Sequence, residues 1–196
     1  MWKYIAGMYV TLMPTVLTGI ANMVFCTLPL CRKLKRPIDN GQTLKDGERV
    51  FGDNKTWKGF IGYVLFGVVF SCLWGLLLNV GGWNSFDFFY VNHSNALPFN
   101  ALIGALQGLF YALFELPNSF LKRRLHITPG KNPKGFKKVF FIFLDQADSI
   151  FGVVLVVCLF AKLPVWFYFV YVLTGAFTHI VINILLYLLK LRKNLF

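Results

Sequence analysis

Hydrophobic residues along this chain occur in long continuous runs that charged positions interrupt only at wide intervals. Uncharged stretches occupy residues 4–31, 59–86, 88–114 and 163–189. Each is longer than the roughly 20 residues that an α-helix needs to cross about 30 Å of hydrocarbon. The pattern therefore predicts four membrane-spanning helices.

A fifth apolar run, residues 139–161, contains two carboxylates, Asp145 and Asp148, in its first half. Its uncharged remainder, 149–161, is too short to cross a bilayer alone, so the run spans only if the aspartates lie near one membrane face. We expect an all-α integral membrane bundle that forms a single domain over residues 1–196. Its five transmembrane helices are expected at about 4–30, 58–80, 96–116, 139–161 and 164–189.

The composition agrees with a membrane protein, because 57% of the residues are hydrophobic and only 14% are charged. One soluble core of this size could not bury so much apolar surface. A cleavable signal peptide is the alternative for the first run, but that run is much longer than the 7–15-residue apolar segment of a signal peptide. The four cysteines have no paired spacing that would indicate a disulfide framework or a zinc site.

Basic residues indicate the orientation, since short loops rich in Lys and Arg stay in the cytoplasm. Residues 32–58 contain eight basic side chains, 115–138 contain seven and 190–196 contain three, whereas the other segments outside the spans contain at most one each. We therefore expect the N-terminus outside, the C-terminus in the cytoplasm, and two long cytoplasmic loops at 31–57 and 117–138. The net charge of +12 is explained by these loops without nucleic-acid binding.

The first loop has turn sequences that suit an anion. Its glycines and its "DNG", "KDG" and "FGDN" segments allow several backbone N–H groups to point at one phosphate. Asp53, Asn54 and Thr56 directly precede the second span. They either cap that helix or contribute to an anion site at its N-terminus, and both interpretations stay open.

The second loop contains three consecutive basic residues, Lys122, Arg123 and Arg124. Arg can bind a phosphate in bidentate fashion and Lys supplies a point charge, so with Ser119 this triplet is a candidate for specific phosphate contacts. The alternative is that the basic residues of this loop only anchor the chain to anionic lipid headgroups.

Asp145 and Asp148 are three residues apart and therefore point the same way from a helix. Two such carboxylates repel unless a cation lies near them. Magnesium suits the pair, because one or two protein carboxylates commonly hold it while substrate phosphates and water complete its coordination. The alternative is a salt bridge from a loop Lys or Arg. Gln146 points in another direction and is expected only to support the aspartates.

Three segments, "PIDNGQTLKDGERVFGDNKTWKGF", "NSFLKRRLHITPG" and "FLDQADSIFG", resemble the CDP-archaeol synthase family, which is related to the CDP-diacylglycerol synthases. The resemblance implies an enzyme of five membrane-spanning helices. It also implies that, with magnesium, CTP and a lipid phosphate give a CDP-activated lipid for phospholipid synthesis and pyrophosphate. Such an enzyme would lie in the cell membrane, with its active site on the cytoplasmic face.

By position, the resemblance implies a metal site at Asp145 and Asp148 and catalytic roles for these two residues. Lys122 and Arg123 are the other catalytic candidates. The candidates for substrate binding are Asp39, Asp53, Asn54, Lys55, Thr56, Ser119 and Arg124.

The sequence also departs from the family pattern. We expect glycine at many relatives' equivalents of Asn40 and Asn54, but asparagine tolerates positive φ, so the turns can persist. "LHITPG" lacks the Lys-Asp pair of the wider CDP-diacylglycerol synthase signature. A third carboxylate, if one is needed, would then come from Asp39 or Asp53.

Three other functional classes fit less well. A small transporter would need broken or polar helices near the midplane, whereas Asn22, His179 and Asn183 are scattered and no repeat is visible. A CDP-alcohol phosphotransferase would continue its aspartate motif with further aspartates, and a scaffold would leave the acidic pair unexplained. The lipid, an ether-linked isoprenoid or a diacyl phosphate, and the oligomeric state are left open.

Overall fold

The computed structural model describes residues 2–129 and 135–191, and the regular structure of this part is helical. Five helices within it are long and apolar enough to cross a membrane. They are α1 (Trp2–Thr27), α2 (Trp57–Val80), α4 (Leu97–Arg124), α5 (Phe136–Ala161) and α6 (Val165–Leu188). The shorter elements are η1 (Arg32–Leu34), η2 (Asn84–Phe86) and α3 (Phe89–Asn92). The predicted five-helix, all-α membrane bundle is confirmed.

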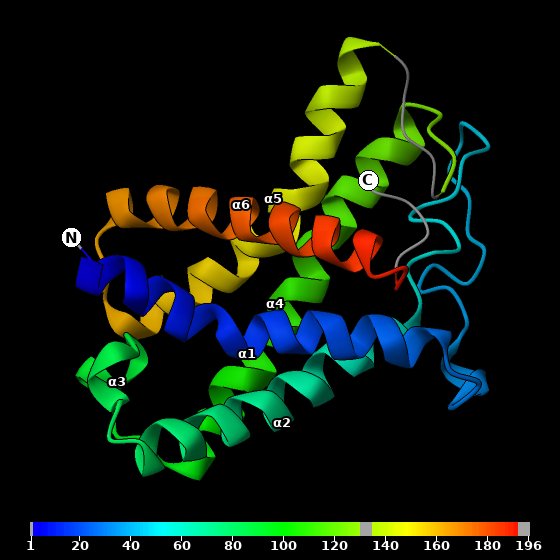
Figure 1. Cartoon of the computed structure of the whole chain (residues 1–196). Helices are drawn as coiled ribbons and strands as arrows, with labels where there is room; N and C mark the ends of the chain where they lie inside the picture. Colours follow the sequence, from blue (N-terminus) through cyan, green and yellow to red (C-terminus); the bar gives the residue numbers. More distant parts are fainter. Residues whose placement is uncertain (1, 130–134, 192–196) are drawn as a thin grey trace.

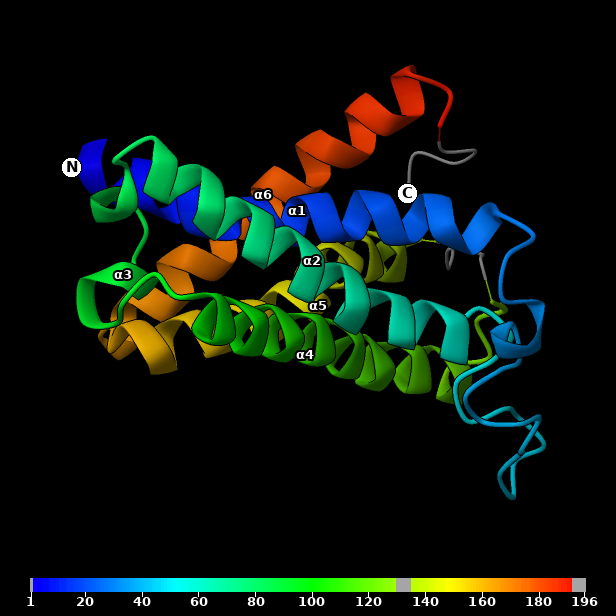
Figure 2. The same ribbon diagram turned by 90° about the horizontal axis from the view of Figure 1, so that it is seen from below.

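The helices alternate in direction, so the connections gather at the two ends of the bundle (Figure 1). The segment between α1 and α2, the described part of the segment between α4 and α5, and the C-terminal end of α6 lie at one end, here called the loop end. The N-terminal end of α1 and α3 lie at the other, and the view from below shows the same arrangement (Figure 2). Placement of the loop end in the cytoplasm stays a prediction.

Helices α2 and α4 approach each other through small residues. Gly67, Ser71 and Gly75 recur every four residues on α2, and Gly104 and Gly108 do so on α4. A Cβ atom on Gly67 would overlap the carbonyl oxygen of Gly104, and one on Gly104 would overlap that of Gly67. Such stripes let helix backbones come close in a membrane, where dispersion contacts replace the hydrophobic effect.

The structure corrects the expected second loop. The third span was predicted to end at about residue 116, but α4 continues to Arg124 with Pro117 inside it. Ser119 and the basic triplet are therefore helical. Lys122 pairs with Asp145 on α5 and Arg124 pairs with Asp46 in the first loop, and basic residues are favourable in the last turn of a helix, so the helix continues beyond its apolar stretch. Residues 130–134 of the expected loop lie outside the described residues.

Asp39 organises the first loop. Its carboxylate accepts hydrogen bonds from the backbone amides of Gly41, Phe51 and Gly52 and forms an ion pair with Arg49. Burial alone would favour the neutral acid, but these donors outweigh it and hold the pKa of Asp39 well below its usual range. The expected positive φ occurs at Asn40, at 46°, whereas Asn54 is not among the described residues with positive φ.

Candidate active site

A cavity of about 640 Å³ opens at the loop end of the bundle. The C-terminal part of α6 diverges from α1 in the view from below (Figure 2), and residues of both helices line the cavity, with α4 and α5 forming more of its wall. One part of the lining is charged. The part between α1 and α6 includes the apolar side chains of Leu12, Val16, Ile20, Ile182 and Leu186.

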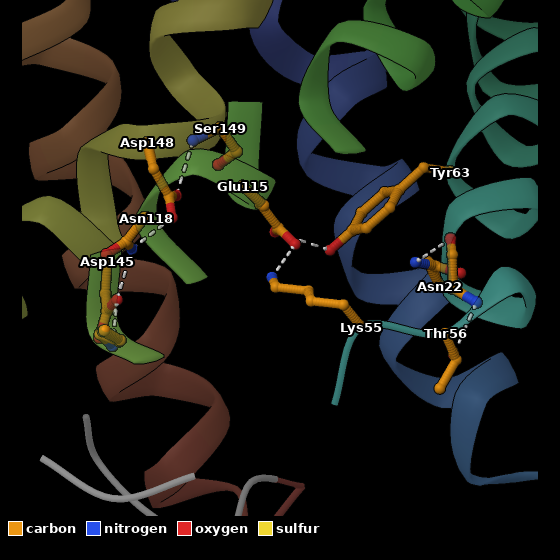
Figure 3. A network of polar contacts seen from close by, with 11 residues as sticks. Asn22, Lys55, Thr56, Tyr63, Glu115, Asn118, Asp145, Asp148 and Ser149 are labelled. Carbon is orange, nitrogen blue, oxygen red and sulfur yellow. Dashed lines mark hydrogen bonds and ion pairs between the residues drawn. The ribbon is translucent and has the colours of Figure 1, made fainter. Parts of the chain in front are cut away.

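Asp145 and Asp148 both line this cavity, and one amide joins them. The Asn118 Nδ2 group donates hydrogen bonds of 2.7 Å to Asp145 Oδ1 and to Asp148 Oδ2 (Figure 3). Asp148 Oδ1 also accepts from the backbone amide of Ser149 at 2.7 Å. The two carboxylates therefore face α4 together, as their spacing on α5 predicts.

Asp145 has a cationic partner as well, because Lys122 Nζ lies 2.5 and 2.6 Å from its two carboxylate oxygens. The alternative of a salt bridge is thus present for Asp145, although its lysine lies on α4. For Asp148 no ion pair occurs among the residues that the structure describes. The charge of Asp145 is therefore balanced by a lysine, whereas that of Asp148 has no such partner in the described structure.

Glu115 places a third carboxylate on the cavity wall, at a position that the sequence analysis did not select. It forms an ion pair with Lys55 and accepts a hydrogen bond of 3.4 Å from the Tyr63 hydroxyl (Figure 3). Burial disfavours the charged form of Lys55, but the Glu115 carboxylate outweighs it and raises the pKa of Lys55 above its ordinary value. Lys55 thus reaches from the first loop into the cavity as a cation.

The cavity also has cationic and polar groups suited to phosphate. Arg123 is 4% exposed, and its Nε is buried with no hydrogen-bond partner in the described structure. Asn54 and Ser119 line the same space. A buried guanidinium without a carboxylate partner favours an anionic ligand, since an uncompensated charge is costly in this setting.

The remaining predicted site residues lie elsewhere. Asp39 is occupied within the first loop, and Arg124 pairs with Asp46 while donating to the backbone carbonyls of Glu48 and Arg49. These two tie the first loop together and to α4, and neither lines the cavity.

Asp53 and Thr56 line a neighbouring cavity of about 440 Å³. The Asp53 side chain is 72% exposed and pairs with Arg49. Thr56 is the N-cap of α2 and accepts from the Gly59 amide at 3.2 Å, which agrees with the capping interpretation. The two cavities share Lys55 and Glu115, so the ion pair between these residues lies at their boundary.

The donor set fits a magnesium ion that shares its coordination with a ligand. Within the described residues no group of three or more His, Cys, Asp and Glu side chains has the arrangement of a complete metal site. However, Asp145, Asp148 and Glu115 line one cavity, and the buried Asn118 Oδ1 has no hydrogen-bond partner in the described structure. Oxygen donors of this kind suit magnesium, which takes its remaining ligands from phosphates and water.

The predicted span placed Glu115 at its very end and left Asn118 in a loop, so neither residue was selected. On a continuous α4, Glu115, Asn118 and Lys122 have the spacing i, i+3 and i+7 and share one face. This spacing can be read from the sequence, but it places the three side chains on one face only if the helix is continuous.

Comparisons with known proteins found a matching family and several relatives. The family profile described as CarS-like, CDP-archaeol synthase, matches residues 5–196. Proteins named CDP-archaeol synthase from Thermofilum pendens, Methanocaldococcus jannaschii and Saccharolobus islandicus are 35%, 30% and 31% identical over 78%, 80% and 80% of this chain. The alignments span 61%, 81% and 80% of those proteins.

A solved structure described as "Structural insight into an intramembrane enzyme for archaeal membrane lipids biosynthesis" has a similar fold. Its TM-score is 0.54 at 22% identity, and the alignment covers 90% of this chain and 92% of that one. At this identity the likeness concerns the fold alone.

Proposed function

The chain belongs to the CDP-archaeol synthase family, and from this premise we propose that it transfers CMP from CTP to a membrane lipid phosphate. The products are a CDP-activated lipid of the CDP-archaeol type and pyrophosphate. The observation that carries the proposal is a single cavity that joins a cluster of carboxylates and cations to the space between α1 and α6. A nucleoside triphosphate and a lipid phosphate can react only if both bind in one such cavity.

The reaction needs little proton chemistry from the protein. A phosphate monoester is largely dianionic at neutral pH, since its second pKa is near 6. One of its oxygens attacks the α-phosphorus of CTP, and the bond from that phosphorus to the bridging oxygen breaks as pyrophosphate leaves. The protein's task is therefore to hold two anionic substrates in line and to offset their charge.

Cationic side chains from two segments meet around the charged part of the cavity. Lys55 comes from the first loop, and Lys122 and Arg123 come from the last turns of α4. Lys55 and Lys122 are held by Glu115 and Asp145, so an incoming triphosphate would compete with these carboxylates for them. Arg123 lacks such a partner among the described residues and is available to a phosphate at once.

The metal would be held by Asp145 and Asp148, with Glu115 and Asn118 beside them. A bound magnesium would lower the charge repulsion between the phosphates and stabilise the leaving pyrophosphate. The chain's own contribution is to keep the carboxylates facing the cavity through Asn118 and to confine the substrates.

The lipid would lie with its phosphate at the charged part and its chains along α1 and α6. Apolar residues of both helices line that space, so the chains need not leave an apolar environment. The reaction would then take place within the membrane leaflet at the loop end, which we assign to the cytoplasm.

A transfer assay tests this proposal. Purified protein in lipid nanodiscs is incubated with CTP labelled at the α-phosphate, magnesium, and either an ether-linked isoprenoid glycerol phosphate or phosphatidic acid. We expect label in the lipid fraction with the ether lipid, no label after chelation by EDTA, and release of pyrophosphate in equal amount. Transfer to phosphatidic acid alone would assign the same chemistry to a diacyl substrate. No transfer to either lipid by folded protein would overturn the proposal.

Nucleotide binding by the first loop gives a further prediction. Lys55→Ala removes a half-buried cation of the cavity wall, so we expect the KM for CTP to rise by about tenfold or more while the KM for lipid changes little. The measurement is the transfer assay with each substrate varied in turn. Lys45→Ala, at an exposed position of the same loop, is the matched control. Unchanged KM for CTP at normal expression would show that Lys55 is only an anchoring charge.

A further inference from the structure

Helix α5 is held on a second side by α6. The Asn183 Nδ2 group donates a hydrogen bond of 2.5 Å to Gln146 Oε1, and both side chains are buried. His179, one turn earlier on α6, lies with its Nδ1 3.1 Å from the backbone carbonyl oxygen of Gln146. Since a carbonyl only accepts, the imidazole donates from Nδ1. Two polar groups of α6 thus bind two atoms of one α5 residue.

We propose that Gln146, His179 and Asn183 form a polar clamp that sets the rotation of α5 and so positions Asp145 and Asp148 in the cavity. These three are positioning residues, and their effect on turnover rests on the function proposed above. Gln146 stands between the two aspartates in sequence but faces α6, while they face α4. The clamp residues also line the cavity, but their hydrogen bonds join α5 to α6, whereas those of the carboxylates join α5 to α4.

The direction of the aspartates depends on this rotation because successive residues of an α-helix are turned by about 100°. A modest twist of α5 would carry both carboxylates away from Asn118. Close packing between α5 and α6 supports the clamp at Ile150, one turn after Gln146 on α5. A Cβ atom on Gly175 of α6 would lie 2.6 Å from Ile150 Cγ2. The two helices are thus in direct contact beside the hydrogen bonds.

Contacts from α4 cannot provide the same control. Asn118 and Lys122 hold α5 through the carboxylates themselves, and those are the contacts that a metal ion or a phosphate must rearrange. The clamp uses no carboxylate. It can hold α5 in place while the contacts of Asp145 and Asp148 change. In an apolar interior such hydrogen bonds also strongly favour one arrangement, because breaking them leaves polar groups unpaired.

A length-exchange experiment tests the clamp. Gln146→Asn shortens one partner by a methylene, Asn183→Gln lengthens the other, and the double variant Q146N/N183Q restores the summed length. We expect each single variant to lower kcat by about ten- to a hundredfold, because small displacements of reacting groups are costly. The KM for CTP should stay within about twofold, since Lys55 and Arg123 are unaffected. The double variant should recover most of the loss.

Two further variants keep the test decisive. Asn183→Leu is close to isosteric and loses the hydrogen bond, so it should reproduce the loss in kcat even if the length variants fold poorly. Thr174→Val is the control, because Thr174 lies on α6 outside the clamp and its hydroxyl donates to the Val170 carbonyl of the same helix.

A second readout does not depend on turnover. Cysteine replaces Asp148 in a background in which the four native cysteines are serine, and the rate of its reaction with a small anionic thiosulfonate is measured. We expect Gln146→Asn and Asn183→Leu to change this rate severalfold and Q146N/N183Q to restore it. If wild-type protein transfers no CMP but this pattern holds, the proposed function fails and the clamp stands. If wild-type protein is active and the double variant rescues neither kcat nor the thiol reaction, the clamp is overturned.

Discussion

Asp145 and Asp148 share the amide of Asn118 but differ in their electrostatic surroundings. Asp145 is held by Lys122, whereas the buried Asp148 accepts only from neutral donors in the described structure. An apolar helix tolerates this pair because each carboxylate has donors and one has a cation. A ligand cation would complete the compensation at Asp148.

Substitution of the two aspartates should therefore separate activity from stability. Asp145→Asn and Asp148→Asn should each lower CMP transfer by about a hundredfold or more, because each removes a charge from the reacting site. Asp145→Asn leaves Lys122 without its carboxylate and should cost about 1–3 kcal/mol of stability. Asp148→Asn removes a poorly compensated buried charge and should leave the Tm unchanged or higher. Thermal unfolding in detergent, together with the transfer assay, measures both effects.

The contrary result is equally clear. If Asp148→Asn lowered the Tm markedly while magnesium-dependent transfer persisted, the pair would be structural. The assignment of the metal site to these residues would then have to be given up.

Asp39 makes the stability of the first loop depend on pH. Its pKa in the folded protein is depressed, so its contribution is fully present above the unfolded value of about 3.9 and is lost as pH falls towards the folded value. Asp39→Asn should lower stability by about 2 kcal/mol at pH 7. The gap between the Tm values of wild type and variant should narrow below about pH 4. A constant gap between pH 7 and pH 3.5 would show that the carboxylate charge is not the cause.

At the scale of elements, the contact between α2 and α4 depends on residues without side chains. Gly104→Ala would place a methyl group against the Gly67 carbonyl, so we expect a loss of about 1–3 kcal/mol and a lower Tm. Gly19→Ala on α1 is the control for stability, because its Cβ would meet only the Tyr111 hydroxyl at 3.8 Å. Equal Tm values for the two variants would mean that α2 and α4 separate easily.

Helix α4 also joins the membrane bundle to the loop end. Its apolar part packs on α2, and its last turns present Glu115, Asn118, Lys122 and Arg123 to the cavity. One rigid helix thus fixes the spacing between the bundle and the charged groups. Sites built on helices hold their geometry better than sites on loops, because the backbone is already ordered.

At the scale of the whole molecule, alternation of the helices places the described parts of the basic segments at one end. This grouping is what the count of basic residues predicts, and it leaves the membrane side to be tested. Single cysteines are placed at native Cys31, at Lys45→Cys in the first loop and at Val91→Cys on α3, with the other cysteines replaced. A membrane-impermeant maleimide should label position 91 in intact cells, and positions 31 and 45 only after permeabilisation. The opposite pattern would invert the topology and move the active site outside.

The sequence by itself determined the class of fold and the number of spans, and it predicts the approximate place of the chemistry. Long uncharged runs and the distribution of basic residues are properties of linear order, and a bilayer permits few solutions for them. The pairing of Asp145 and Asp148 on one face followed from helix geometry alone. The motifs quoted from the chain also led to the family that the comparisons then showed.

Only the tertiary structure decided which polar residues reach the cavity. Asp39, Arg123 and Arg124 were all candidate site residues in the sequence. In the structure Asp39 bonds within the first loop and Arg124 bonds to that loop, whereas Arg123 lines the cavity. Glu115 lies on the cavity wall because α4 continues beyond its apolar stretch and brings this residue next to Lys55. Such choices depend on contacts between residues far apart in the chain, and local pattern does not encode which donor meets which acceptor.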